Sequence, residues 1–171
     1  MSRHFGPILQ NGFAVRDWRS AAQHWIDVMG VGPFFLMAHI EFEWCEFRGE
    51  PADIDMSVAI AYTGEQQIEL VQQHNDAPSI YTEFLAANEP GLQHMGVFVE
   101  DLQRTLDRHD LREKIVQQGR TAAGVNFAYV DTIFHNGTML ELIEVDDGIR
   151  GAFGYMQQAS VGWDGSDPIR G

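Results

Sequence analysis

An internal repeat limits the folds open to this chain more than any other feature of its sequence. Residues 10–18 (QNGFAVRDW) align without a gap with residues 94–102 (HMGVFVEDL). In each copy an alternating apolar run, typical of a strand, leads to an Asp that can cap a following helix. The repeat therefore predicts two related modules. Its matched positions are Gln10 with His94, Gly12 with Gly96, Val15 with Val99, and Asp17 with Asp101.

A second pair of matching segments supports the two-module interpretation. Residues 68–71 (IELV) resemble residues 140–143 (LELI), and in both a glutamate interrupts an apolar strand. Glu69 follows the first copy of the repeat, and Glu141 follows the second. Each module thus contributes one polar residue from its first strand and one glutamate from a later strand.

Turn formers and apolar periodicity predict the elements of each module. The first module is predicted to be a strand, a helix and further strands, and the second module repeats this order. The segment 34–47 fits either one long strand or a bent pair of strands. The predicted ranges are strands 8–15, 34–47, 54–62 and 66–72 with a helix over 18–29; a short helix after Pro78; and strands 91–99, 124–130, 132–135 and 138–145 with a helix over 102–118 and a hairpin turn at Asn136-Gly137.

These elements indicate an α+β chain with four segments. Residues 1–73 form the first module, 74–90 a connecting helix or linker, and 91–147 the second module. Residues 148–171 form a C-terminal extension, which we expect to be helical over 149–159. Packing, or capping of a neighbouring subunit, is the role we expect for this extension.

Composition excludes several classes of partner and site. The formal net charge is −14 and the pI is near 4.7, whereas binding to nucleic acid or to anionic membranes requires basic clusters. Cys45 is the single cysteine, so an intrachain disulfide is ruled out. The N-terminal segment has no continuous apolar stretch of the kind found in signal peptides, and no later segment reaches transmembrane length. We therefore expect a cytoplasmic protein.

Four polar residues of the two modules suit a divalent metal. If the modules are related by pseudo-symmetry, Gln10, Glu69, His94 and Glu141 can converge from four strands, giving an amide oxygen, two carboxylates and an imidazole. Such a set fits Zn²⁺, Ni²⁺, Co²⁺, Mn²⁺ or Fe²⁺. Two buried carboxylates repel each other unless one takes up a proton or a dication lies between them. Taken singly, each residue has an ordinary alternative, because a histidine can be a hydrogen-bonded core residue and a glutamate can face solvent on an edge strand.

The other histidines and the aromatic residues carry weaker signals. Phe98 shares a strand face with His94, so it is a candidate pocket wall, together with Trp44 and Tyr129. The same aromatic residues could instead belong to the core. Among the other histidines, His24 is expected to be exposed. His39 and His135 could line the cavity, although a surface position is favoured for each, and the pattern assigns no position to His74.

At this point the paired segments resemble the vicinal oxygen chelate superfamily, in its glyoxalase I and methylmalonyl-CoA epimerase branch. The resemblance covers about residues 9–145, and its motifs are QHMGVFVEDL, FAYVDT and the two Glu-Leu strands. It implies two βαβββ modules with paired, curved, mixed sheets, in a glyoxalase/bleomycin-resistance type of fold. It also implies metal ligands on the first and last strands of each module, here Gln10, Glu69, His94 and Glu141. Many members of the family have His at the position of Gln10, but a Gln/Glu/His/Glu set also occurs, in zinc-dependent glyoxalase I.

The resemblance implies a divalent-metal-dependent isomerase, epimerase or lyase. In such enzymes the metal holds a carbonyl or enediolate oxygen of the substrate, and a carboxylate moves the proton on the adjacent carbon. We assign Glu141 as the base, with Glu69 second and with Glu43 and Glu46 as further residues that could reach the pocket. The expected substrate is a small carbonyl compound or a thioester, and the expected assembly is a homodimer. A phosphate-binding glycine loop and a Lys/Arg cluster, which would mark a CoA site, are not found in the sequence.

Two other functions remain open on the same fold. A non-catalytic protein that binds and sequesters a small molecule would need only an apolar groove. A ring-cleaving dioxygenase would need two histidines and one carboxylate around Fe²⁺, and Gln10 stands where the second histidine would be. Fold alone does not separate these three functions.

Overall fold

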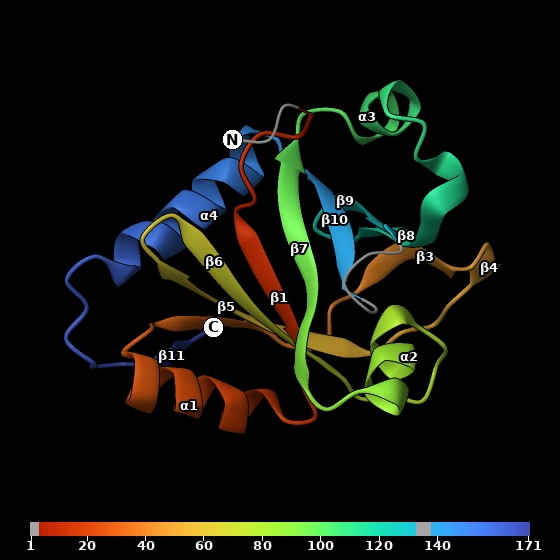
Figure 1. The fold of residues 1–171 in the computed structure, drawn as a ribbon. Helices are drawn as coiled ribbons and strands as arrows, with labels where there is room; N and C mark the ends of the chain where they lie inside the picture. The colour runs from red at the N-terminus through yellow and green to blue at the C-terminus, as the bar shows by residue number, and fades with distance from the viewer. Residues whose placement is uncertain (1–3, 133–137) are drawn as a thin grey trace.

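A computed structural model describes residues 4–132 and 138–171, and its elements follow the predicted two-module order (Figure 1). Asp17 caps the first helix by accepting a hydrogen bond from the Arg19 backbone, and Gly30 ends it in the left-handed conformation, as predicted. The first module and its connection contain β1 (Gln10–Ala14), α1 (Trp18–Met29), β2 (Phe34–Met37), β3 (Phe42–Phe47), β4 (Glu50–Pro51), β5 (Met56–Thr63), β6 (Gln66–Gln73) and α2 (Ile80–Ala87). The remainder contains β7 (Gly91–Val99), α3 (Leu102–Arg108), the 3₁₀ helix η1 (Arg112–Lys114), β8 (Ile115–Thr121), β9 (Asn126–Val130), β10 (Met139–Glu144), α4 (Asp147–Ser160) and β11 (Ile169–Arg170).

The strands of the described residues form one curved mixed sheet in the order β11-β2-β5-β6-β1-β7-β10-β9-β8-β3-β4. In each module the first strand is parallel to the last, since β1 pairs with β6 and β7 pairs with β10. The two modules meet where β1 and β7 lie antiparallel at the centre of the sheet (Figure 1). This arrangement confirms the α+β class and the paired, curved sheets.

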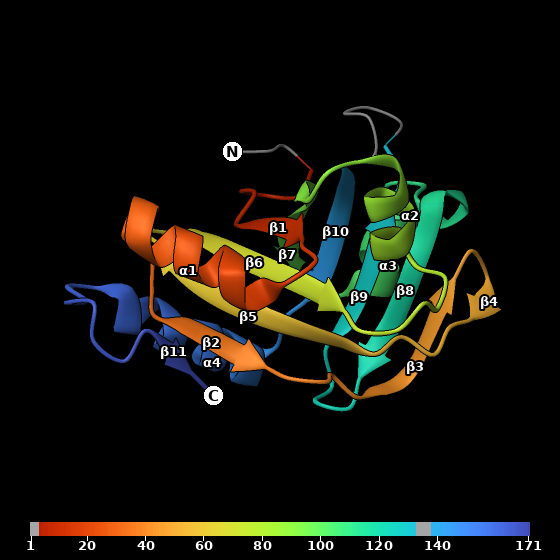
Figure 2. The same cartoon turned by 90° about the horizontal axis from the view of Figure 1, so that it is seen from below.

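Alternate residues of β5 separate two apolar layers. Ala59 and Ala61 pack beneath α1, whereas Val58 and Ile60 face the layer that includes Phe153 of α4. Because successive strand residues point to opposite faces, α1 and α4 lie on opposite sides of the first half-sheet (Figure 2). In the second module α3 covers a third apolar cluster on β7, β9 and β10.

A four-residue segment, 38–41, connects two distant edges of the sheet, and we call it the strap. It joins β2, which pairs with β5, to β3, which pairs with β8, and seven strands separate β2 from β3 in the strand order. In a flat sheet these strands would be roughly 38 Å apart, at about 4.8 Å per strand. The strap and its two end residues reach at most roughly 18 Å. The sheet must therefore curl until its edges approach, and the predicted bent pair over 34–47 is confirmed.

The predicted helix over residues 102–118 is wrong beyond Arg108. Helical spacing continues only through the buried Leu102 and Leu106, and Asp110 has a φ of 54°, which is incompatible with a continued helix. β8 follows, and its Gly119 lies so close to β3 that an added Cβ would be 2.8 Å from the Trp44 backbone oxygen. The prediction failed because a polar strand with a central glycine lacks a clear alternating pattern.

The remaining predictions divide between confirmed and untested ones. The strand over 138–145 and the tail helix over 149–159 are confirmed by β10 and α4. The turn at Asn136-Gly137 and residues 133–135 of the predicted strand over 132–135 lie outside the described residues. We propose to keep 1–73 and 91–147 as the module bounds. In the described part of the chain, none of the helices has the length and apolar character that a membrane crossing needs.

Candidate metal centre

Three of the four predicted ligands converge on one point. Glu69 of β6, His94 of β7 and Glu141 of β10 each offer one ligand atom, and these atoms lie within 4.8 Å of one another. The Nε2 atom of His94 is 3.0 Å from Glu69 Oε2 and 3.3 Å from Glu141 Oε2. His94 is fully buried, and Glu141 and Glu69 expose only 5% and 9% of their surface.

The repeated glycines make room for the repeated polar residues. In the register of β1 and β7, Gly12 lies opposite His94 and Gly96 lies opposite Gln10. A Cβ on Gly12 would be 1.9 Å from two atoms of the His94 ring, and a Cβ on Gly96 would be 2.4 Å from Gln10 Oε1. The glycine of each module therefore accommodates the polar side chain of the other module, which explains why both residues recur in the repeat.

The contact of Nδ1 with Gln93 determines the orientation of the His94 ring, and so the direction of the lone pair on the other ring nitrogen, Nε2. Nδ1 lies 2.9 Å from Oε1 of Gln93, a fully buried side chain. A neutral imidazole that donates from Nδ1 presents the Nε2 lone pair to the two carboxylates. Three acceptors then surround one point, and only a proton or a cation between them relieves their repulsion.

Without a cation, protons hold this cluster together. Burial raises the pKa of Glu141 to about 7; His94 opposes this increase, and the Glu69 carboxylate adds to it. Burial acts to lower the pKa of His94, but the two carboxylates outweigh it and the net pKa is raised. Although Glu141 Oε2 is 3.3 Å from His94 Nε2, it finds no hydrogen-bond partner among the described residues. A single N–H at Nε2 serves Glu69 and leaves Glu141 unpaired.

Gln10 reaches the same cluster but presents its amide nitrogen to it. Nε2 donates to Gln67 Oε1 at 2.6 Å and to Glu69 Oε1 at 3.3 Å, while Oε1 is buried without a partner among the described residues. Gln67 in turn donates to the Tyr62 hydroxyl at 2.8 Å. Reversing both amides would preserve the bonds between Gln10, Gln67 and Tyr62, since a hydroxyl can also donate, but it would replace the bond to Glu69 with the Gln10 oxygen facing that carboxylate. Ligation by Gln10 stays a prediction.

The cluster forms part of the wall of a cavity of about 640 Å³. Gln10, Glu69 and Glu141 reach the cavity at the sheet, and most other walls are apolar side chains. Among the described residues that line the cavity there is no Lys or Arg. The apolar lining from β5, β9, β10 and α4 consists of Met56, Val58, Ile60, Phe127, Ile143, Ile149, Ala152, Phe153 and Met156.

Two buried tyrosines stand beside the cluster. Tyr129 lines the cavity, and its ring meets the His94 ring edge-on at 5.1 Å between centroids. Its hydroxyl is 2.8 Å from the hydroxyl of Tyr81, which also lines the cavity. Burial, reinforced by the charge of Glu141, raises the pKa of both tyrosines well above its ordinary value. Both hydroxyls therefore remain hydrogen-bond donors.

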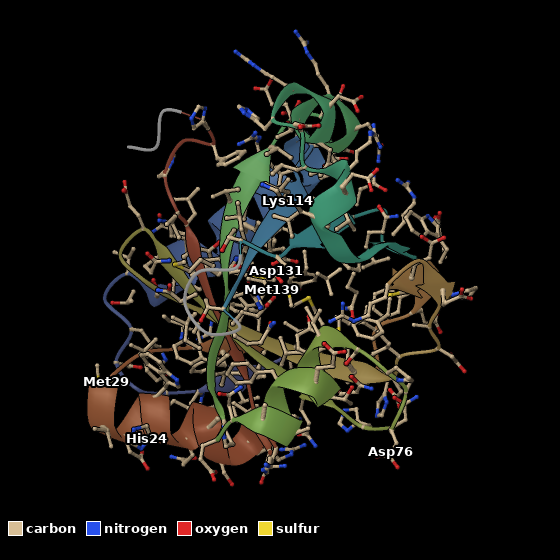
Figure 3. All side chains as sticks on the ribbon, turned by 45° about the vertical axis from the view of Figure 1, so that its right-hand side comes forward. His24, Met29, Asp76, Lys114, Asp131 and Met139 are labelled. Atoms are coloured by element: carbon tan, nitrogen blue, oxygen red, sulfur yellow. The ribbon has the colours of Figure 1, made fainter. Side chains whose placement is uncertain are left out.

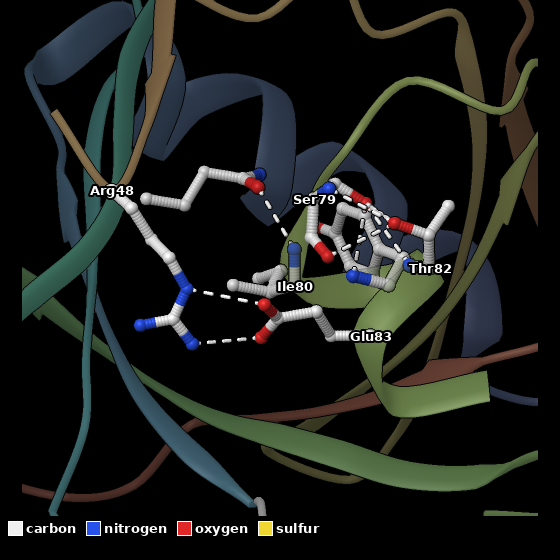
Figure 4. Close-up of polar contacts among 7 residues, drawn as sticks. Arg48, Ser79, Ile80, Thr82 and Glu83 are labelled. Atoms are coloured by element: carbon white, nitrogen blue, oxygen red, sulfur yellow. Dashed lines mark hydrogen bonds and ion pairs between the residues drawn. The ribbon is translucent and has the colours of Figure 1, made fainter. Parts of the chain in front are cut away.

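The helix α2 positions Tyr81 through polar contacts at its first turn (Figure 4). Ser79 and Thr82 form a capping box, and Gln117 of β8 accepts a hydrogen bond from the Ile80 backbone at 3.1 Å. An exposed ion pair between Arg48 and a glutamate of α2, drawn in the same figure, contributes little by comparison. The cap completes the first turn of α2, and the Gln117 contact attaches this helix to the second module.

Other predicted pocket residues lie elsewhere. Trp44 is 43% exposed and lines a separate hollow, and Phe98 stacks on Phe153, which lines the cavity. Glu43 pairs with Arg120 and Glu46 accepts a hydrogen bond from Gln118, so neither is directed to the cluster.

The structure also shows where two of the other histidines and the C-terminal tail lie. His24 is exposed on α1, as expected (Figure 3), and His39 lines the cavity at the strap; His135 lies outside the described residues. The C-terminal tail was expected only to pack or to cap a neighbour, but α4 forms one wall of the cavity. The spacing of Ile149, Phe153 and Met156 on one helical face could have indicated this role.

The chain is similar to a known protein family and to several solved structures. Residues 9–129 match the Glyoxalase/Bleomycin resistance protein/Dioxygenase superfamily, and no curated protein matches the chain. Methylmalonyl-CoA epimerase from Mycobacterium tuberculosis is 20% identical, with a TM-score of 0.60 over 88% of this chain and 95% of that one. A hypothetical protein from Bacillus halodurans C-125 is 16% identical, with a TM-score of 0.59 over 82% of this chain and 95% of that one.

A third similar structure contains a bound ligand. A variant of Streptomyces coelicolor methylmalonyl-CoA epimerase, in complex with 2-nitronate-propionyl-CoA, is 15% identical with a TM-score of 0.54 over 84% of this chain and 96% of that one. At these identities the structures establish a shared fold and not a shared substrate. The family match spans most of the chain, including the strands that carry Gln10, Glu69 and His94. The chain belongs to the Glyoxalase/Bleomycin resistance protein/Dioxygenase superfamily, also called the vicinal oxygen chelate superfamily, and its fold is that of the epimerase-like branch.

Proposed function

We propose that this protein is a divalent-metal-dependent isomerase, epimerase or lyase that moves a proton on the carbon next to a carbonyl group. The observation that supports it is the cluster of Glu69, His94 and Glu141, three buried acceptors that converge at the wall of an apolar cavity. An arrangement of this kind is costly unless a cation or protons neutralise it. We therefore regard it as a binding site and not as ordinary core packing.

The donor set fits a cation of the Zn²⁺, Co²⁺, Ni²⁺, Mn²⁺ or Fe²⁺ type. Glu69, Glu141 and Nε2 of His94 would hold it, with Gln10 as the fourth ligand once its amide is reversed. When bound, such an ion would supply Lewis-acid stabilisation for the oxyanion that develops as a proton leaves the carbon beside a carbonyl. Gln93 would keep the His94 ring oriented for this role.

Hydrogen bonding distinguishes the two glutamates as candidate bases. In the arrangement without a cation, both oxygens of Glu69 have partners, since Oε2 faces His94 Nε2 and Oε1 accepts from the Gln10 amide in its present orientation. Glu141 has an oxygen that no described residue bonds, and its side chain reaches the cavity. Glu141 is therefore the proposed base, and Glu69 the structural ligand. The Tyr129 hydroxyl stands beside Glu141, where it can donate a hydrogen bond and orient that carboxylate.

The cavity favours a compact, apolar carbonyl substrate over a CoA thioester. CoA carries phosphates, which proteins bind with basic side chains or with backbone N–H groups at helix N-termini. The described lining has no Lys or Arg, and its charged groups include Glu41 and Asp146. An uncharged aliphatic or aromatic carbonyl compound matches the apolar side chains of β5, β9 and α4.

The two alternatives have less support. Sequestration of an apolar compound would use the same cavity but gives no role to buried carboxylates beside a histidine. Ring cleavage by Fe²⁺ requires a second histidine, and the cluster contains one histidine with two glutamates. The homodimer and the cytoplasmic location stay predictions from the sequence.

Metal analysis followed by a proton-exchange assay tests the proposal. Purified wild type, His94→Ala and Glu141→Gln would be compared with Glu65→Gln, a matched change on the exposed turn between β5 and β6. We expect a tightly held divalent metal in the wild type and in Glu65→Gln, and a loss of that metal or a much weaker hold in the two centre variants. Carbonyl compounds incubated in D₂O should then exchange the adjacent hydrogen only with metal-loaded protein, as seen by NMR. Failure of the reconstituted wild type to hold any metal would refute the mechanism and favour sequestration.

A further inference from the structure

A second group of metal-ligating side chains lies at the strap, and its residues come from three separate segments. His39 belongs to the strap, Asp55 immediately precedes β5, and His74 immediately follows β6. One ligand atom from each lies within 4.8 Å of the others. We propose that His39, Asp55 and His74 form a second divalent-cation site, which we call the rim site, distinct from the buried centre and independent of the reaction proposed for it.

Hydrogen bonds orient the two histidines of the rim site. Ser57, which is 2% exposed, places its Oγ 2.7 Å from His74 Nε2 and accepts a bond from the His39 backbone N–H at 3.1 Å. With Nε2 engaged by the hydroxyl, His74 keeps Nδ1 for a ligand, and a second contact of this kind is what metal-binding histidines ordinarily have. The Ser57 hydroxyl thus contacts both the His39 backbone and the His74 side chain.

The backbone around the site is also organised. His39 has a φ of 48°, in the left-handed region that few side chains other than glycine adopt. The loop that carries Asp55 is held by Asn75, which donates to the Asp53 carbonyl at 2.8 Å and accepts from the Asp55 N–H at 3.3 Å. The His74 N–H also donates to the Asp55 carbonyl at 2.7 Å. The three ligands therefore stand on a connected scaffold.

The geometry of the side chains fits a shared ligand better than a simple ion pair. His39 Nδ1 is 2.7 Å from Asp55 Oδ1, and the rings of His39 and His74 are 4.7 Å apart between centroids. An exposed ion pair of His39 and Asp55 would contribute little to stability and would not require the second imidazole. Two imidazoles and a carboxylate form a set that suits Zn²⁺, Co²⁺ or Ni²⁺ and leaves positions for water.

Local charge favours a cation at this place. Between Arg48 and Arg104 the sequence contains no Lys or Arg, and this interval includes two of the three ligands. Asp53 and Asp76 lie within two residues of Asp55 and His74. The side chains of His39 and Asp55 are 66% and 43% exposed, so a cation at the rim site exchanges with solvent and binds more weakly than one at the buried centre.

Occupation of the rim site would stiffen one wall of the cavity. His39 lines the cavity from the strap, whereas Asp55 and His74 are fixed at the ends of β5 and β6. A cation that joins them ties the strap to the first half-sheet. The rim site would then control how readily the strap moves, and so how readily a small molecule enters the cavity.

Titration with Zn²⁺ tests the rim site separately from the buried centre. Calorimetry would compare metal-free wild type with His39→Gln/His74→Gln and with His24→Gln, a matched change at an exposed histidine on α1. We expect two equivalents in the wild type and in His24→Gln, and one tight equivalent in the double variant. If the buried centre does not bind Zn²⁺, the wild type should take one equivalent and the double variant none, which would support the rim site while refuting the proposed function.

Two further measurements keep the proposal open to refutation. Ser57→Ala should weaken the second equivalent about 10–100-fold without changing the first, as second contacts of metal ligands do. Hydrogen exchange should slow in residues 38–41 when the second equivalent binds. Equal stoichiometry and affinity in the wild type and in the folded double variant, as judged by circular dichroism, would overturn the rim site.

Discussion

Replacement of Gly12 by alanine tests whether the repeated glycines exist to admit the buried ligands. The added Cβ would lie 1.9 Å from Cε1 and Nε2 of His94 and 2.5 Å from Cδ2. Heavy atoms do not approach so closely, and His94 has no exposed surface toward which to move. The imidazole must therefore rotate away or the strands β1 and β7 must separate.

The cost of Gly12→Ala has two parts. Overpacking a well-packed interior typically costs about 1–3 kcal/mol. A displaced imidazole also loses its hydrogen bonds to Gln93 and Glu69, at roughly 1–2 kcal/mol for bonds of this type. The free energy of unfolding should thus fall by roughly 2–5 kcal/mol, a large fraction of the total for a domain of this size. Metal binding at the buried centre should be lost, because one of three ligands no longer points at it.

Urea unfolding and Zn²⁺ titration measure these two effects, and two other glycines provide controls. A Cβ on Gly154, within α4, meets no atom within 4 Å, so Gly154→Ala should leave metal binding unchanged and stabilise the helix by up to about 1 kcal/mol. A Cβ on Gly96 would press on Gln10 and not on His94, so Gly96→Ala should weaken metal binding less than Gly12→Ala does. A Gly12→Ala protein with wild-type metal affinity and a stability loss below about 1 kcal/mol would refute the reasoning.

Three further predictions follow from the same cluster. The free energy of unfolding of metal-free wild type should fall as pH rises from about 4.5 to 7, because native Glu141, with a pKa of about 7 against an ordinary 4.5, keeps a proton that the unfolded chain has released. This contribution is on the order of 3 kcal/mol and should vanish in Glu141→Gln; an identical pH profile of urea unfolding in that variant would contradict the assignment. Zn²⁺ binding to the buried centre near pH 7 should release protons from Glu141 and His94, because the pKa values of both groups are raised. Calorimetry in buffers of different ionisation enthalpy measures that release, and binding without proton release would be inconsistent with the protonated cluster. Tyr129→Phe should reduce the free energy of unfolding by about 1 kcal/mol, because the hydrogen bond to Tyr81 is lost. It should also shift the pH profile of proton exchange, because the hydroxyl beside Glu141 is gone. An unchanged profile would assign Tyr129 to packing alone.

Features that recur in both modules could be predicted from the sequence. The repeat identified β1 and β7 as equivalent strands and put Gln10 and His94 at equivalent positions, and the second match added Glu69 and Glu141. Convergence of Glu69, His94 and Glu141 follows once β1 and β7 pair antiparallel, because the last strand of each module lies parallel to the first. The direction of the Gln10 amide could not be predicted, since it depends on Gln67 and Tyr62.

Spatial relations between features that occur only once in the chain were not predicted. A bent pair was one of two alternatives predicted for the apolar segment 34–47, but its pattern does not indicate that the two halves join opposite edges of the sheet. His39, Asp55 and His74 have no counterparts in the repeat and lie at irregular spacings, and the pairing of β2 with β5 and of β5 with β6 brings them together. The mistaken helix over 102–118 has a similar cause, since β8 is specified by its pairing with β3 and β9 more than by its own pattern.

The division between repeated and unrepeated elements also bears on specificity. The strands that carry the buried cluster are related by the repeat, so the chemistry at that point depends on the symmetric part of the fold. The cavity walls that meet a substrate include the strap and α4, which have no equivalent in the other module. Relatives with the same strands and a different connection or tail would therefore keep the buried cluster and change the shape of the cavity beside it. Two features of the cavity therefore limit the compounds that it can bind: the apolar face of α4, and the lack of Lys and Arg in the described lining. The fold shared with the epimerases is a weaker guide to the substrate.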